Sequence, residues 1–211
     1  MRYFLVFVLS AGAFAQTLSM GLKVGVPVTD AFHAASVGNI SYIGETRRFV
    51  IGPTVELHLP FGFSAEVDAL YRNQRFRSSL QASSATLTAS TSSGAWEFPV
   101  LAKYRMLAGP VRPFVLGGLS FNRLTGVKQD FSCTGSGCTP GTTGSTGTPG
   151  ELEHRSSVGI VLGAGLELNV LVVKLSPEIR YTGWTLPNFS ASTGGLKSVQ
   201  NQAEFLVGIN F

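Results

Sequence analysis

The last ten residues of the chain, 202–211, alternate between apolar and polar side chains. Neighbouring side chains of a β-strand point to opposite faces. One face of such a strand would therefore carry Ala203, Phe205, Val207, Ile209 and Phe211, and the other would carry Gln202, Glu204, Gly208 and Asn210. Only Leu206 interrupts the pattern. The segment predicts a strand whose apolar face must be covered by a core or by lipid.

Most of the chain repeats this period of two. Further alternating segments lie at 18–29, 47–60, from 63 onward, at 96–106, 112–128, 151–169 and 173–182. The fifth of these changes parity, because Phe114 and Leu116 fall on one face while Leu119 and Phe121 fall on the other. A β-bulge at Gly117 and Gly118 would bring all four to one side. With the closing segment, the pattern predicts about eight strands.

The connections between these segments alternate in length. Short turns are expected at Pro60–Gly62, near 108–110 and near 170–171, whereas the long loops are 30–46, 78–94, 129–149 and 187–198. The loop 78–94 is mostly Ser, Thr and Ala without an apolar period, which predicts a polar loop. The loop 129–149 is almost entirely Gly, Ser, Thr and Pro around two cysteines, so we expect it to be mobile.

The first fifteen residues have the pattern of an export signal. Arg2 is followed by an apolar run at 3–9 and by Ala13-Phe14-Ala15, a small-x-small cleavage pattern. We therefore expect a signal peptide at 1–15 and one mature domain at 16–211. In an exported chain, Cys133 and Cys138 predict a disulfide within one loop.

The composition is rich in apolar residues and poor in charged ones, which favours a β-structure with a large apolar surface in a core or in lipid. Charged residues make up 13% of the 211 residues, and the mean hydropathy is +0.25. After the signal, no apolar run approaches the roughly 18 residues of a membrane helix. These values leave a large buried β core or a β-barrel in lipid. The net charge of +4 is scattered along the chain, which gives no support for nucleic-acid binding.

Aromatic and charged residues favour the barrel in lipid. Aromatic side chains fall near the strand ends on the apolar face, at one rim Phe49, Tyr71, Trp96, Phe98 and Tyr181, and at the other Phe63, Tyr104 and Phe211. Charged side chains fall on the opposite face, where they would have to pair inside a narrow lumen. The predicted polar network of the lumen comprises Lys23, Glu56, His58, Glu66, Asp68, Arg72, Glu97, Lys103, Arg105, Glu167, Lys174, Glu178, Arg180 and Glu204.

The alternation, the terminal Phe211 and the turn Leu59-Pro60-Phe61-Gly62-Phe63 resemble the OmpA/OmpX-type outer-membrane β-barrel domain. The resemblance implies an all-β, closed, antiparallel, up-and-down transmembrane barrel in the bacterial outer membrane, in contact with its lipid. It also implies that barrel-insertion machinery reads the closing strand, through Phe205, Val207, Ile209 and Phe211. It brings no catalytic motif and no cofactor, and we expect no extension beyond Phe211.

Catalysis is weakly supported. His33 is expected in a solvated loop, and His58 is expected to be hydrogen-bonded in the lumen near Glu56. His154 and Ser156 form a His-x-Ser pair like that of some eight-stranded lipid A deacylases. The acid at comparable spacing is Glu167, which falls on the opposite face and near the other strand end. No His or further Cys accompanies the two cysteines, so we expect no metal site.

Four functions remain open. The leading hypothesis is a non-enzymatic barrel that displays surface loops, with a structural, adhesion or envelope role. A narrow porin-like channel or carrier for small solutes is the alternative, and an outer-membrane lipid hydrolase is a remote one. The last is a secreted soluble β-sandwich or lipocalin-like binder, with its charges outside. Any surface ligand is expected on the loops 30–46, 78–94, 129–149 and 187–198.

Overall fold

The computed structural model describes residues 18–29, 32–33, 36–37, 39–44, 49–106, 109–139, 141–170, 173–190 and 197–211. The expected signal peptide lies outside these ranges. Within them, no helix is long and apolar enough to cross a membrane.

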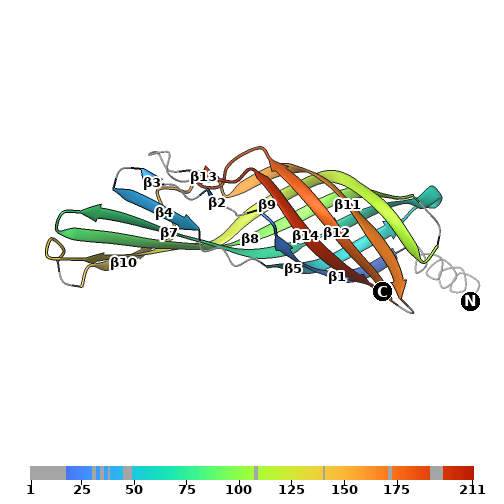
Figure 1. Ribbon diagram of the computed structural model, residues 1–211, viewed down its shortest axis with the longest axis horizontal. Helices are drawn as coiled ribbons and strands as arrows, with labels where there is room; N and C mark the ends of the chain where they lie inside the picture. Colours follow the sequence, from blue (N-terminus) through green and yellow to red (C-terminus); the bar gives the residue numbers. More distant parts are fainter. Residues whose placement is uncertain are drawn as a thin grey trace, which may run out of the picture.

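Within the described residues, eight antiparallel strands close into a ring (Figure 1). Strands β6 and β7 count as one, because only Ala69 separates them. Pairing of β1 with β14 and of β8 with β9 leaves no open edge in the barrel wall. The members are β1 (Leu18–Pro27), β5 (Val50–His58), β6 (Phe63–Asp68) with β7 (Leu70–Ala82), β8 (Ala85–Arg105), β9 (Val111–Thr134), β11 (Ser156–Val170), β12 (Val173–Trp184) and β14 (Asn201–Asn210).

The predicted faces are confirmed along the closing strand. On β14, Phe205 is exposed, while Glu204, Leu206 and Asn210 point inward and are buried. The outward side chains of the other strands are mostly large and apolar, and the inward ones mostly polar. Exposed apolar residues on the outside of a closed ring fit a lipid environment. The role of the closing strand in insertion stays a prediction.

The predicted bulge at Gly117 and Gly118 is wrong. Both glycines lie in uninterrupted pairing, opposite Ala102 and Leu101 of β8 on one side and Leu162 and Val161 of β11 on the other. The four apolar residues therefore keep opposite faces: Leu119 and Phe121 point outward, whereas Phe114 and Leu116 are buried inside the barrel. The prediction failed because it assumed that every apolar side chain faces lipid.

The predicted polar loop at 78–94 is also wrong, because this segment continues β7 and β8 as a hairpin. Cross-strand pairing runs without a break from Leu70 opposite Glu97 to Ala82 opposite Ala85. Thr is favoured in strands, and the partial exposure of both faces at 85–90 removes the apolar period. A register shift in the pairing with β9, between Ser92 and Gly94, lies where the hairpin leaves the barrel wall.

The other long connections contain strands as well. The predicted loop at 129–149 contains the end of β9 and β10 (Thr143–Thr146), which pair with each other. Within 30–46 lie β2 (Phe32–His33), β3 (Ser36–Val37) and β4 (Ile40–Gly44), and within 187–198 lies β13 (Lys197–Ser198), paired with β2. The sixth barrel strand begins at Ser156 and not at Glu151. Short strand pairs thus replace several of the expected loops.

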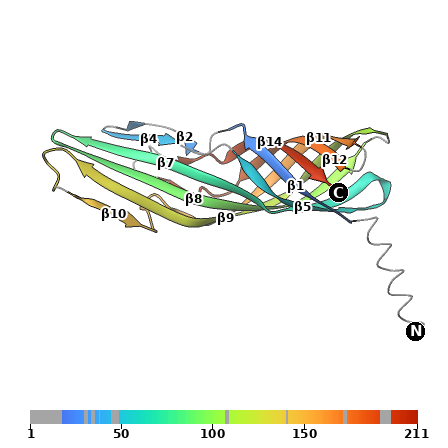
Figure 2. The same ribbon diagram turned by 90° about the horizontal axis from the view of Figure 1, so that it is seen from below.

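These extensions form a sheet, here called the arm, that projects beyond one end of the barrel (Figures 1 and 2). The arm consists of residues 76–94, 128–134, β10, β4 and β3. Ala82, the last residue of β7, lies eleven residues beyond Tyr71 on the barrel rim, about 36 Å at 3.3 Å per residue. The opposite end of the barrel has short connections, including the turn η1 (Pro60–Gly62), where Phe61 and Gly62 adopt positive φ values of 62° and 81°.

Aromatic side chains occur at both ends of the outer surface. At the arm end, the rings of Tyr71 and Trp96 are 5.2 Å apart, and Trp96 stacks on Phe98 at 6.3 Å. At the short-turn end, the rings of Phe63 and Tyr104 are 4.8 Å apart. This arrangement matches the two aromatic girdles of membrane barrels and indicates where the bilayer surfaces lie.

Candidate functional site

The lumen is filled by side chains arranged in layers. From the arm towards the short turns, β7 and β6 present inward Phe76, Arg72, Leu70, Asp68 and Glu66, and β8 presents Ala95, Glu97, Leu101, Lys103 and Arg105. The two series therefore place an apolar lid, a charged layer, an apolar layer and a second charged layer in the same order. The structure places all predicted lumen residues on the inner face, with only His58 and Lys174 half-buried rather than buried.

The second charged layer, nearer the short turns, is the larger one and is centred on Glu66. Its carboxylate binds Lys23 and Lys103, each at 2.5 Å, and Arg180 at 2.6 Å. Arg180 also binds Asp68 and Glu178, both at 2.7 Å. These side chains come from strands on different sides of the ring and have almost no exposure. Buried charges are tolerated only when they are paired, and here each has at least one partner.

The layer continues towards the short turns. Arg105 binds Glu56, and it binds Glu167 at 2.7 Å. Glu56 also accepts a 2.5 Å hydrogen bond from the hydroxyl of Ser64. At the rim, the Nε2 atom of His58 lies 3.5 Å from Arg105 and 3.4 Å from Lys174. The ion pairs therefore form a continuous network from mid-barrel to the short-turn rim.

An apolar layer separates the two charged layers. One cluster consists of Leu101, Phe114, Leu116 and Val161, and another of Val50, Leu70 and Leu206. The ammonium group of Lys103 lies 4.5 Å from the ring centroid of Phe114, where the apolar and charged layers meet. The inward Leu206, which interrupts the alternation of the closing strand, belongs to this layer.

The first charged layer, nearer the arm, is centred on Arg72. Its guanidinium binds Glu97, binds Glu204 at 2.5 Å and donates a 2.9 Å hydrogen bond to the side chain of Gln202. Glu97 accepts a further hydrogen bond of 2.8 Å from Ser120. This layer holds β7, β8, β9 and β14 together from inside the ring.

An apolar lid, which the sequence analysis did not predict, closes the arm end of the lumen. It consists of Tyr42, Phe76, Ala95, Leu124, Val127 and Phe189. The rings of Phe76 and Phe189 meet edge to face at 5.4 Å. Phe189 follows β12, which lies opposite β7 in the ring, so this contact spans the mouth. The inward parity of Phe76, between Arg75 and Arg77, was the signal in the sequence that could have revealed it.

The structure does not assemble the considered catalytic groups. Nδ1 of His154 lies 3.3 Å from the backbone oxygen of Pro187, and Ser156 points outward. Glu167 is buried in the lumen, where it binds Arg105. Ser156 and Glu167 therefore lie on opposite faces of β11. His33, which was expected in a solvated loop, has its backbone in β2. Among the described residues, no group of His, Cys, Asp and Glu could hold a metal ion.

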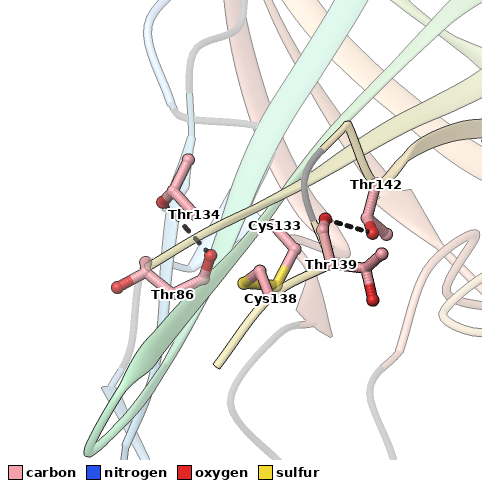
Figure 3. Close-up of a disulfide and its surroundings, with 6 residues drawn as sticks. All are labelled: Thr86, Cys133, Thr134, Cys138, Thr139 and Thr142. Carbon is pink, nitrogen blue, oxygen red and sulfur yellow. Dashed lines mark hydrogen bonds between the residues drawn. A yellow bond between two sulfur atoms is a disulfide. The ribbon is translucent and has the colours of Figure 1, made fainter. Parts of the chain in front are cut away.

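The predicted disulfide is present in the arm (Figure 3). Cys133 and Cys138 are joined with their Cα atoms 5.7 Å apart, at the turn between β9 and β10. The hydroxyl of Thr142 donates a 2.7 Å hydrogen bond to the backbone oxygen of Thr139 in the same turn. Thr134 donates a longer bond of 3.4 Å to the backbone oxygen of Thr86. The crosslink thus closes the turn where β9 is paired with β8.

A polar trough lies on the outward face of the arm. It has a volume of about 580 Å³ and includes Arg77 and Asp130, with hydroxyl groups of Thr88, Ser90, Ser132 and Ser145 between and beside them. These residues lie in neighbouring rows of paired strands. Hydroxyls flanked by one cation and one anion are suited to polar ligands.

The fold and the layered lumen define a small transmembrane β-barrel of the outer-membrane class. Residues 14–183 match the family described as "Outer membrane protein beta-barrel domain", and the chain belongs to this family. Membership places the protein in the bacterial outer membrane as a class. No curated protein sequence matches the chain.

Three solved structures similar to this chain are small outer-membrane barrels. OprG from Pseudomonas aeruginosa has a TM-score of 0.52 at 11% identity, and the alignment covers 92% of each chain. The Neisserial surface protein NspA has a TM-score of 0.48 at 15% identity, covering 92% of this chain and 94% of that one. Ail of Yersinia pestis, in complex with a heparin analogue, has a TM-score of 0.42 at 11% identity, covering 92% and 99%.

Proposed function

We propose that this protein is a closed, non-enzymatic barrel that anchors a β-sheet arm at the cell surface, in an adhesion or envelope role. One observation carries the proposal: the lumen is filled by paired charges and apolar layers beneath an apolar lid. A solute path would require breaking several of these contacts at once. The channel alternative therefore has no observation in its favour.

Conductance is the first test. The purified protein, reconstituted into planar bilayers, is expected to give no stable steps of porin size, because paired side chains occupy the lumen. A matched sample of a known porin verifies that the bilayer detects open channels. Stable porin-sized steps from the folded protein would overturn the closed-barrel proposal.

The second test concerns the orientation of the arm. An epitope inserted between Ser83 and Ser84, at the tip of the β7–β8 hairpin, is expected to bind antibody on intact cells. The same epitope inserted in the turn Pro60–Gly62 is the control and is expected to react only after the outer membrane is opened. The reverse pattern would place the arm in the periplasm and contradict the proposal.

The role of the arm can be tested by shortening it in register. Deleting 79–82 and 85–88 leaves the Ser83-Ser84 turn between Ser78 and Ala89, which are already paired. Because the barrel wall is untouched, the variant is expected to keep its heat-dependent gel mobility. Loss of cell adherence or of survival in SDS is then expected. If both properties match the parent, the arm has no such role.

A further inference from the structure

An apolar pocket opens on the outer surface of the barrel wall, at the arm end of β9 and β11. It has a volume of about 440 Å³, and Phe98, Phe121, Val158 and Leu186 are among the residues that form it. Phe121 is paired in register with Phe98 on one side and with Val158 on the other. All four side chains are exposed, so the pocket faces the surroundings of the barrel.

The pocket lies where the wall loses a strand. Pairing between β11 and β12 ends at Gly159 opposite Trp184. Beyond this point, the backbone nitrogen and the hydroxyl of Thr185 both donate to the backbone oxygen of Val158, at 2.9 and 2.7 Å. The chain then continues through Leu186, which borders the pocket in place of a paired strand. The pocket therefore forms where the backbone pairing between β11 and β12 ends.

The pocket lies at the expected membrane surface. Arg123 is paired with Trp96 on one side and with Ser156 on the other, and Trp96 belongs to the aromatic girdle at the arm end. Phe121 precedes Arg123 by two residues, or about 7 Å, on the hydrocarbon side. The exposed Arg123 is therefore at headgroup depth, while the phenylalanine wall is at the depth of acyl chains.

Outward cations gather on this side of the barrel. They are Arg75 and Arg77 on β7, and Arg123 and Lys128 on β9. On β9, the outward carboxylate is Asp130, which binds Lys128 at 3.0 Å. Among the side chains that the structure describes, the arm ends of β12, β14, β1 and β5 carry no outward Lys or Arg. Among the described side chains, the outward positive charge at the arm end thus lies on the side that holds the pocket.

We propose that this pocket binds a phosphorylated, acylated glycolipid of the outer leaflet. One acyl chain would lie along Phe98, Phe121 and Val158, and a phosphate would bind the guanidinium of Arg123. Basic sites beside apolar membrane surfaces bind lipid headgroups in this manner. The hydroxyl-lined trough of the arm lies on the outward face farther from the bilayer, where the sugars of such a lipid extend. That trough favours a glycolipid over a phospholipid.

The test is native mass spectrometry of the delipidated, folded barrel mixed with bisphosphorylated lipid A. Arg123→Ala is expected to weaken binding at least about tenfold, because a charge-assisted contact to phosphate is lost. Val158→Trp, which fills the pocket, is expected to weaken it similarly. Arg112→Ala, at the short-turn end of β9, is the matched control and is expected to bind as the parent does. Heat-dependent gel mobility verifies that each variant is folded.

Two comparisons of ligands complete the test. Lipid A without phosphates is expected to bind the parent about tenfold more weakly than bisphosphorylated lipid A does. It is expected to bind the parent and Arg123→Ala equally. Parent-like binding by both Arg123→Ala and Val158→Trp would overturn the site. Phosphatidylglycerol that binds as tightly as lipid A would overturn the choice of a glycolipid. The outcome does not depend on whether the barrel conducts, so it is separate from the test of the closed lumen.

Discussion

Strand β8 passes through two environments, and its two parts follow different rules. In the barrel, residues 95–105 alternate strictly, with buried Glu97, Lys103 and Arg105 opposite exposed Phe98 and Val100. In the arm, residues 85–94 are nearly all Ser, Thr and Ala on both faces. The same backbone ladder continues through both. Alternation therefore reports a difference between the two faces, and it disappears along 85–90, where both faces are at least partly exposed.

The two regions also differ in what stabilises them. The barrel has no open edge, and its interior charges link strands across the ring. Among the described residues, the arm has open edges at β10 and β3, and its apolar packing lies mainly at its base, in the lid. Beyond the lid it depends on cross-strand hydrogen bonds, polar contacts and the disulfide. Changes in the barrel should therefore be costly, and changes in the arm should be local.

The largest effect is expected from Glu66→Ala. Removing this carboxylate takes away the shared partner of Lys23, Lys103 and Arg180, and it leaves Lys103 with Glu56 at 3.5 Å. Breaking a buried ion network from one side costs about 3–5 kcal/mol. Urea titration of the folded gel band measures the change. Glu153→Ala, at an exposed position, is the control, and equal midpoints for the two variants would show that the network does not stabilise the barrel.

A double variant sharpens this prediction. Lys103→Met removes a cation that Glu66 binds, so the double variant no longer buries this cation without its nearest carboxylate. The loss in the double variant is expected to be smaller than the sum of the two single losses. Additive losses would mean that the two side chains do not interact through their charges.

The next largest effect compares two outward positions on β8. Val100 lies midway between the aromatic residues Trp96 and Tyr104, and it is 50% exposed. Val100→Lys would place a charge near the middle of the bilayer, at a cost of about 2–4 kcal/mol. Thr88→Lys, on the outward face of the arm, is expected to change stability by less than about 0.5 kcal/mol. The same urea titration distinguishes them, and equal effects would contradict the assigned membrane position.

The contrast within β8 also explains how much the sequence could predict. The eight strands, their faces and the lumen charges were predictable, because lipid and lumen impose opposite side-chain chemistry at Val100 and Lys103. The arm was missed at 78–94 because the period is absent there, although the β-branched threonines favour a strand. The inward Phe114 and Leu116 were misassigned because a pattern cannot distinguish an apolar layer in the lumen from lipid. The lid requires tertiary contact between Phe76 and Phe189.

The smallest effect is expected from removing the disulfide. Replacing Cys133 and Cys138 by Ser opens a loop with a sequence separation of 5, which lowers local stability by about 2 kcal/mol. Faster amide exchange is expected in 125–146, because β10 is paired only with β9 among the described residues. Exchange in 173–184 is the internal control and should not change. A shift of the barrel's urea midpoint would instead show that the arm and the barrel unfold together, contrary to the division drawn from β8.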